Sequence, residues 1–139
     1  MRTEDIEAAD IVLLGVSRTS KTPTSIYLAN KGYKTLNIPL VGEQRIPSAL
    51  KKLPDSFCVI GLSVEAKRLS DIRTNRLEIM KESNTTRYSD LGFIQKEIEN
   101  SKKLFKKYNW PIIDVTRKSV EETAASIIRI FDIKKRKKQ

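Results

Sequence analysis

Short apolar runs alternate with amphipathic segments along this chain, and that alternation constrains its fold more than any other feature. The apolar runs are rich in β-branched residues, as strands buried on both faces are, and they span residues 11–14, 35–39, 57–62 and 110–115. Segments with helical spacing of their apolar residues lie between and after them, at about residues 23–31, 48–53, 65–81, 90–108 and 120–131. This order predicts an α/β fold in which helices flank a parallel sheet.

Local signals refine this prediction. Ser119 and Glu122 form a capping box that marks the start of the last helix. Pro23 favours the first turn of a helix, since its missing N–H costs nothing there. Cys58 lies inside an apolar run, so we expect it to be buried in a strand. Residues 82–89 are polar and predict a loop. Ligands of parallel sheets bind beyond the carboxyl ends of the strands, so the loops that follow the strands are the candidate sites.

One of these loops has the pattern G-x-x-x-x-S-K-T, directly after the first predicted strand. The Walker A pattern is G-x-x-x-x-G-K-[ST], whose backbone N–H groups curl around a phosphate while the next helix directs its dipole at the same anion. We therefore predict a nucleotide-binding loop and a P-loop kinase-like three-layer sandwich. The alternative is a polar turn before a helix. The predicted loop residues are Gly15, Val16, Ser17, Arg18, Thr19, Ser20, Lys21 and Thr22.

Three side chains of the loop suit phosphate chemistry. Lys21 can place its ammonium against the outer phosphates, and Arg18 can add a planar fork of donors. The Thr22 hydroxyl can ligate Mg²⁺. Ser20 stands where the pattern has its second Gly, and a Ser suits that position only if the backbone does not need a positive φ.

Arginines outside the loop are further candidates. Arg73 and Arg76 lie three residues apart on one predicted helix, where Arg76 continues the apolar stripe of Leu69 and Ile72. They predict either a clamp on a transferring phosphoryl group or stems that extend to solvated heads. Arg117 follows the last predicted strand and can stack on adenine; the alternative there is a capped helix start.

A catalytic carboxylate is not evident in the sequence. The third apolar run ends in Gly61-Leu62-Ser63, without the Asp of a Walker B strand. Asp114 is an acidic candidate, although a structural role is the simpler interpretation. Weaker general-base candidates are Asp10, Asp55 and Asp71.

Composition bounds the class of protein. The chain of 139 residues carries a net charge of +10, which favours an anionic partner. It has no His and a single Cys, which excludes a His general base and an internal disulfide. No apolar run is long enough to span a membrane and no signal pattern opens the chain, so we expect a cytoplasmic protein. We assign residues 1–133 to one domain and expect the basic residues 134–139 to be a disordered tail. Nucleic-acid binding by that tail is an alternative, but few aromatic residues interleave with basic ones elsewhere.

Three blocks of the sequence resemble the regulatory proteins of pyruvate, phosphate dikinase and of phosphoenolpyruvate synthase, a family of bifunctional kinase-pyrophosphorylases. The blocks span residues 9–29, 68–77 and 110–124. Thr19-Ser20 before Lys21 is similar to the dikinase branch, whereas the synthase branch typically carries Cys-Gly there. Family members are roughly twice this length, with the loop in mid-chain, so this chain corresponds to their C-terminal half.

The resemblance implies two activities for residues 1–133, as a phosphotransferase domain. One is ADP-dependent phosphorylation of an active-site Thr of pyruvate, phosphate dikinase, and the other is phosphate-dependent removal of that phosphoryl group with release of pyrophosphate. The resemblance implies ADP and phosphate as substrates and a possible homodimer, and the family's nucleotide segment corresponds to Gly15 through Thr22. From the residues themselves, we predict Lys21, Arg18, Arg73 and Arg76 as catalytic residues and Mg²⁺ as the metal. Because the chain is short, the alternatives are a non-catalytic nucleotide-binding or dikinase-docking remnant and a regulator of the synthase.

Overall fold

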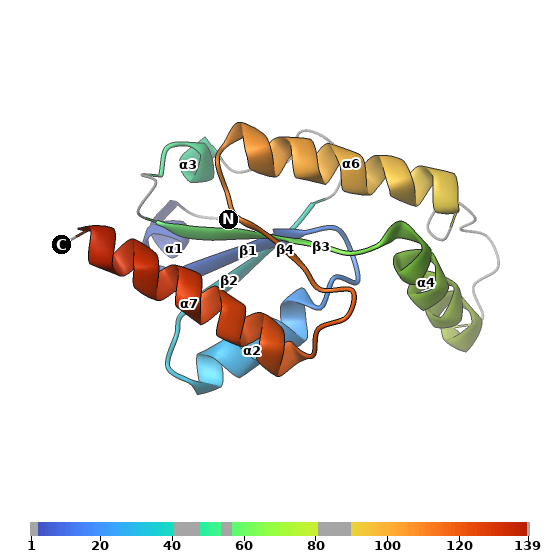
Figure 1. Cartoon of the computed structure of the whole chain (residues 1–139), viewed down its shortest axis with the longest axis horizontal. Coiled ribbons are helices and arrows are strands. Elements are labelled where there is room, and N and C mark those ends of the chain that lie inside the picture. The colour runs from blue at the N-terminus through green and yellow to red at the C-terminus, as the bar shows by residue number, and fades with distance from the viewer. Residues whose placement is uncertain (1–2, 41–47, 54–56, 81–89, 139) are drawn as a thin grey trace.

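A four-stranded parallel sheet forms the centre of the molecule. The computed structural model describes residues 3–40, 48–53, 57–80 and 90–138. The strands are β1 (Ile11–Gly15), β2 (Thr35–Pro39), β3 (Cys58–Ser63) and β4 (Ile112–Asp114), and they lie in the order β2-β1-β3-β4 (Figure 1). Each neighbouring pair is parallel. This confirms the predicted α/β fold with a parallel sheet.

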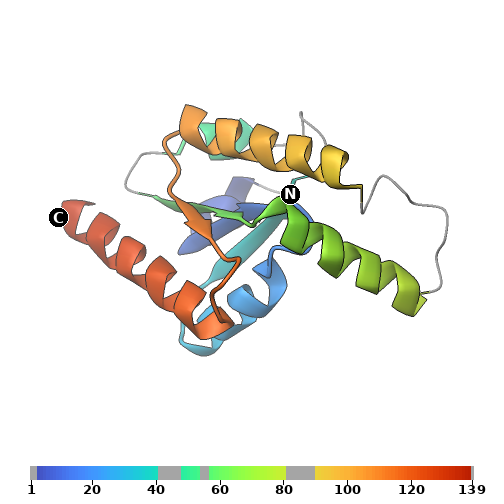
Figure 2. The same cartoon turned by 45° about the vertical axis from the view of Figure 1, so that its right-hand side comes forward.

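Helices cover both faces of the sheet (Figure 1). Helices α2 (Lys21–Asn30) and α7 (Val120–Lys138) pack together on one face, and α1 (Thr3–Ala8), α3 (Ser48–Lys51) and α6 (Leu91–Lys107) cover the other. Helix α4 (Ala66–Met80) leaves the carboxyl edge of the sheet and packs against α6, as Figure 2 shows from the side.

The two central strands, β1 and β3, are buried along their whole length, whereas the edge strands β2 and β4 are only partly buried and end in the exposed residues Pro39 and Asp114. Along β1, Ile11 and Leu13 belong to one core cluster, whereas Val12 and Leu14 belong to a second cluster that includes Phe105 of α6. Alternate strand residues thus point to opposite layers of helices. Cys58 is also buried, as predicted.

Helix α6 approaches the sheet closely at one glycine. A Cβ atom added to Gly61 of β3 would lie 2.4 Å from the ring of Phe105, which is fully buried. A larger residue in the middle of β3 would therefore push α6 away from the sheet.

Several predicted boundaries shift in the structure. The last strand is shorter than predicted, because Trp110 stacks on Tyr108 at a centroid distance of 4.9 Å instead of extending the ladder. Helix α2 begins two residues before Pro23. Helix α1 was not predicted; it buries Ile6 completely. The predicted loop at residues 82–89 lies outside the described residues.

The expectation of a disordered tail from Lys134 is wrong for residues 134–138, since helix α7 continues through Lys138. Lys and Arg have high helix propensity, and positive charge near the C-terminus of a helix interacts favourably with its dipole. The Lys135 ammonium also lies 6.0 Å from the centre of the Phe131 ring, one turn earlier.

Within the described ranges, no helix combines the length and the apolarity that crossing a bilayer requires.

Candidate phosphate-loop site

The predicted phosphate loop lies at the carboxyl edge of the sheet, between β1 and α2. From β1 the chain proceeds to β2 on one side and then crosses to β3 on the other. Such a reversal leaves a crevice at the strand ends, where open α/β sheets bind their ligands. The Leu40 N–H donates to the Gly15 carbonyl at 3.0 Å, so the chain that follows β2 borders the start of the loop.

Gly15 is required by the close approach of its neighbours. A Cβ atom there would lie 2.6 Å from Thr19 Oγ1 and 3.1 Å from the carbonyl oxygen of Leu62 on β3. The Thr19 hydroxyl donates back to the Val16 carbonyl at 2.9 Å and closes the loop on itself. The loop can therefore curl in this way only with a glycine at the first position of the pattern, Gly15.

Ser20 has a left-handed backbone, with φ of 63° and ψ of 23°. The condition that a Ser suits this position only without a positive φ is wrong: the loop has the conformation that the second Gly of the pattern supplies, and a Ser adopts it here. Arg18 is left-handed as well, with φ of 70°. A side chain in this region costs about 1–2 kcal/mol of backbone strain. The loop therefore holds two strained residues next to the candidate ligand position.

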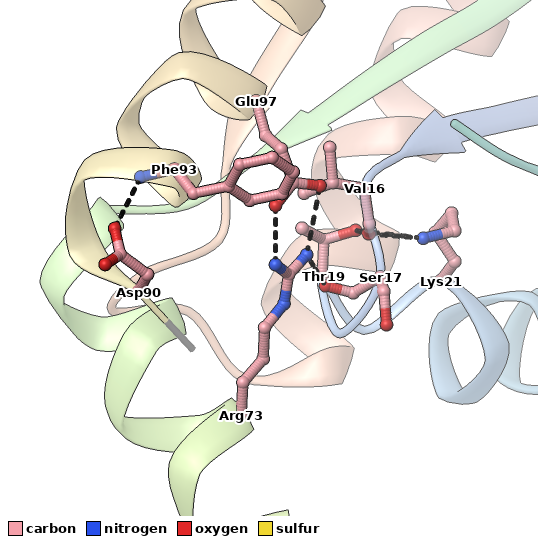
Figure 3. Close-up of polar contacts among 8 residues, drawn as sticks. All are labelled: Val16, Ser17, Thr19, Lys21, Arg73, Asp90, Phe93 and Glu97. Carbon is pink, nitrogen blue, oxygen red and sulfur yellow. Dashed lines mark hydrogen bonds and ion pairs between the residues drawn. The ribbon is translucent and has the colours of Figure 1, made fainter. Parts of the chain in front are cut away.

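Lys21 is buried at the start of α2 and bonded to its own loop. Its Nζ donates to the Val16 carbonyl at 2.6 Å and to Thr19 Oγ1 at 3.3 Å (Figure 3). Burial lowers the pKa of Lys21 to about 8, and the positive charges of Arg73 and Arg18 add to the shift. Three cationic groups thus gather around the loop, and a bound anion would relieve their mutual repulsion.

Arg73 connects three elements beneath the loop. Its side chain on α4 is almost fully buried, Nη1 donates to Glu97 Oε1 of α6 at 2.6 Å, and Nη2 donates to the Ser17 carbonyl at 3.2 Å (Figure 3). Arg73 thus supports the loop from below. Of the two arginines predicted on this helix, the side chain of Arg76 lies outside the described residues.

The other predicted residues lie around the same edge. Thr22 is exposed in the first turn of α2, and Arg18 is exposed in the loop. Arg117 is exposed after β4, at the carboxyl end of a strand two positions from β1. Base contact by Arg117 remains a prediction.

Among the acidic candidates, those that the structure describes have local partners. Burial alone would raise the pKa of Asp114, but hydrogen bonds from the hydroxyl and N–H of Thr116, with Lys102 and Lys118, lower it below its usual range. Asp10 accepts from the Lys34 N–H near the amino end of β1, away from the loop. Asp71 pairs with Lys67 on the surface of α4. Asp55 lies outside the described residues.

Two hydroxyl groups at the carboxyl edge of the sheet, those of Thr22 and Ser63, are candidate ligands for a metal that accompanies a nucleotide. Ser63 ends β3 immediately after Leu62, and its buried Oγ has no hydrogen-bond partner among the described residues. The described part of the chain holds no cluster of three acidic, Cys or His side chains that could bind a metal. Mg²⁺ bound to a nucleotide needs only one or two protein oxygens, since phosphates and waters complete its shell. Thr22 and Ser63 fit that role.

A cavity of about 530 Å³ adjoins the loop along α6. Val16 at the start of the loop and Leu40 after β2 form part of its wall, and α6 supplies Phe93, Glu97 and Leu104. Glu97 therefore takes part both in the cavity and in the ion pair below the loop.

Neither Glu97 nor this cavity was predicted from the sequence. The sequence did contain one hint of this cavity. Phe93 is an apolar residue outside the stripe that α6 buries, and its side chain is 43% exposed. The pairing of Glu97 with Arg73 had no signal, because it depends on how α4 and α6 pack.

The structure defines an α/β protein with a four-stranded parallel sheet, flanking helices and a Walker A-like sequence pattern in the loop at the carboxyl edge of β1. The chain belongs to the kinase/pyrophosphorylase family, which it matches over residues 1–128. This confirms the resemblance stated above.

Several relatives carry a common name. The chain is 65% identical over 132 residues to a protein of Pelagibacter ubique (strain HTCC1062) named "Putative pyruvate, phosphate dikinase regulatory protein", and the match covers 95% of this chain and 48% of that protein. Proteins with the same name from Erythrobacter litoralis and from Wolbachia of Brugia malayi are 53% and 50% identical over 129 residues, which is 93% of this chain and 46% and 47% of theirs. The chain thus spans about half the length of the curated relatives it matches.

Proposed function

We propose that this chain is the nucleotide-binding catalytic part of a regulator of pyruvate, phosphate dikinase. In this proposal it phosphorylates a Thr of the dikinase with ADP and removes that phosphoryl group with inorganic phosphate. The observation that carries the proposal is the curled loop at the sheet's carboxyl edge, with the buried Lys21 bonded inside it. The family membership and the names of the relatives support the same reaction and the same target.

The two reactions are phosphoryl transfers with different acceptors. In the first, the Thr oxygen of the target attacks the β-phosphorus of ADP, the bond to the bridging oxygen breaks, and AMP leaves with its electron pair while the hydroxyl proton is lost. In the second, an oxygen of inorganic phosphate attacks the phosphothreonine phosphorus, and pyrophosphate forms while the Thr oxygen regains a proton. Both transition states carry negative charge on the phosphoryl oxygens, which positioned cations and N–H groups stabilise.

The residues of the loop have distinct proposed roles. Backbone N–H groups of Gly15–Thr22 surround the phosphates, and Lys21 and Arg18 meet the transferring group. Arg73 holds the loop in place through Ser17. Mg²⁺, which neutralises charge on the phosphates when bound, would be held by Thr22, with Ser63 as a further hydroxyl at the same edge.

The proposal extends to the wider assignments made from the sequence. We place residues 1–133 in one phosphotransferase domain with a P-loop kinase-like three-layer arrangement, acting in the cytoplasm. Arg76 and Arg117 remain candidates for contact with phosphate and base, and a homodimer is the expected assembly.

The length of the chain favours a second candidate function. Since it spans about half of its relatives, it can act as a nucleotide-binding or dikinase-docking module without turnover. Regulation of phosphoenolpyruvate synthase, instead of the dikinase, is the variant of the first proposal that the family resemblance leaves open.

A transfer assay separates these candidates. The chain is incubated with the dikinase and ADP radiolabelled in its β-phosphoryl group, and label is then sought on Thr of the dikinase. The proposal predicts labelled dikinase with the wild type and none with Lys21→Ala. ADP binding without any transfer would support the module without turnover, and transfer only to the synthase would reassign the target.

A further inference from the structure

The cavity beside the phosphate loop has the dimensions of a ligand site. Its volume of about 530 Å³ falls within the range of about 300–1,000 Å³ that small-molecule sites usually have. It is continuous with the loop because Val16, the second loop residue, lines it, and Lys21 Nζ bonds to the carbonyl of the same residue. A ligand whose phosphates occupy the loop can therefore extend into this cavity.

The walls of the cavity suit a flat, partly apolar group. Val16, Leu40 and Leu104 supply aliphatic surface, and Phe93 supplies an aromatic ring. The backbone that carries this ring is fixed at the start of α6, since the Phe93 N–H donates to the carboxylate of Asp90, the N-cap of the helix, at 2.9 Å (Figure 3). Bases stack on such rings through their π faces.

Polar groups of the cavity match the edge and the sugar of a nucleoside. Asn100 carries an amide with both a donor and an acceptor, which can pair with adjacent donor and acceptor atoms on an adenine edge. Glu97 retains acceptor capacity beyond its bonds to Arg73, because a carboxylate has about four lone-pair sites, and ribose hydroxyls are suitable donors. Lys96, Lys103 and Lys107 make the wall cationic, which favours an anionic ligand overall.

We propose that this cavity is the nucleoside subsite: the adenine of a nucleotide held by the phosphate loop stacks on Phe93 and pairs with Asn100. The inference rests on the proposed function, since it assumes a nucleotide in the loop. It places the base against α6 and not against Arg117, which is exposed after β4 and is not among the residues that line the cavity.

The test compares ADP with inorganic pyrophosphate, which carries the diphosphate without the nucleoside. Both are titrated with Mg²⁺ into the full chain and into Phe93→Ala and Asn100→Ala. Leu91→Ala and Gln95→Ala are the matched controls, because both residues are exposed on α6 and neither lines the cavity. All four sites are exposed helix positions, where Ala favours the helix, so the variants are expected to fold.

We expect Phe93→Ala to weaken ADP binding about tenfold and to leave pyrophosphate binding unchanged. Asn100→Ala should weaken ADP binding with the same selectivity, and the two controls should bind both ligands as the wild type does. Lys21→Ala should weaken the binding of both ADP and pyrophosphate.

Two kinds of failure are distinguishable. If ADP binds the wild type no more tightly than pyrophosphate, or if Phe93→Ala binds ADP as the wild type does, the subsite is refuted and the phosphate loop stands. Selective loss of ADP binding in Arg117→Ala alone would place the base after β4 instead. A folded wild type that binds neither ligand would overturn the proposed function together with this inference.

Discussion

Ser20 shows how much the phosphate loop depends on the backbone of a single residue. Its φ of 63° is the conformation that Gly adopts readily and other residues adopt at a cost. The residue that follows it, Lys21, starts α2 and turns back to the carbonyl of Val16. The strain at Ser20 thus accompanies the turn that puts the ammonium inside the loop.

Replacing this serine by glycine should relieve the strain. We expect Ser20→Gly to raise the free energy of unfolding by about 1 kcal/mol, because the relief of a left-handed backbone exceeds the entropy that Gly adds to the unfolded chain. Urea denaturation measures the change. Ala29→Gly is the control, an exposed position in the same helix with ordinary helical geometry, and it should lose about 1 kcal/mol. Equal losses in the two variants would contradict a strained Ser20.

The pKa of Lys21 makes a prediction about pH. In the free protein Lys21 loses its proton near pH 8, whereas a bound phosphate favours the protonated ammonium. ADP affinity should therefore be nearly constant between about pH 7 and about pH 8, where the terminal phosphate is mostly ionised, and should fall by up to about tenfold for each further pH unit. Calorimetric titrations at several pH values measure this. Lys21→Arg should remove the fall, because guanidinium stays charged in this range. A wild type with flat affinity up to about pH 10 would contradict the lowered pKa.

The lowered pKa of Lys21 also affects the stability of the free protein, but in the opposite direction: stability rises with pH where ADP affinity falls. Unfolding returns Lys21 from a pKa of about 8 to its ordinary 10.5, so the unfolded chain binds more protons between these two values. The contribution of Lys21 to stability therefore improves as pH rises through that window.

At the scale of elements, an ion pair joins α4 to α6 beside their shared apolar core. The Arg73 side chain is 2% exposed and that of Glu97 is 24% exposed, so the two partners are not equivalent. Removing the Glu97 charge takes this carboxylate away from a buried guanidinium near Lys21, which is also cationic. Removing Arg73 leaves a carboxylate that water can reach.

Glu97→Gln should therefore lower the free energy of unfolding by about 2–3 kcal/mol, somewhat less than for a fully buried pair because Glu97 is partly solvated. Chemical denaturation measures the loss. The control is Glu99→Gln, an exposed position of the same helix, where a change within about 0.5 kcal/mol is expected. If the two substitutions have equal effects, the ion pair does not hold these helices together.

The contact of α6 with the sheet makes a separate prediction. Gly61→Ala should cost about 1–3 kcal/mol of folding free energy, because its Cβ would lie 2.4 Å from the Phe105 ring. In a protein that already carries Phe105→Leu, Gly61→Ala should cost less folding free energy than it costs in the wild type. Gly92→Ala on α6 is the control, where the nearest atom is 3.3 Å away on a flexible carboxylate and no comparable loss is expected. A wild-type denaturation midpoint for Gly61→Ala would refute the close packing.

At this scale, the sequence could predict those features that depend on residues close together in the chain. Continuous apolar runs predicted the strands, and the capping box predicted the start of α7, where Ser119 and Glu122 bond each other's backbone N–H. The inward side of α4 could not be chosen from its own pattern. Leu69 and Arg73 face inward, while Ile72 is only half-buried, because the position of Glu97 on another helix stabilises the arginine. Pairing of this kind depends on tertiary packing.

At the scale of the whole molecule, two properties bear on activity: the net charge of the chain and the share of its relatives' length that it spans. The net charge of +10 attracts anions in general, whereas the candidate phosphate loop offers a buried ammonium, that of Lys21, at the carboxyl edge of the sheet. The loop's place in the fold was predictable from sequence, since its strand and helix precede and follow it directly. The cavity along α6 was not, because it forms between segments that are far apart in the chain. The chain spans about half of its relatives, so nucleotide binding and phosphoryl transfer need separate tests.

The most direct test of the central claim is a calorimetric titration of ADP with Mg²⁺ into the wild-type chain and into Lys21→Ala. We predict saturable binding to the wild type and a loss of about 1.5–3 kcal/mol in the variant, the contribution of a charge-assisted bond to phosphate. Circular dichroism of both proteins controls for folding. A folded wild type that does not bind ADP, or a variant that binds it equally well, would contradict the assignment of this loop as a nucleotide site.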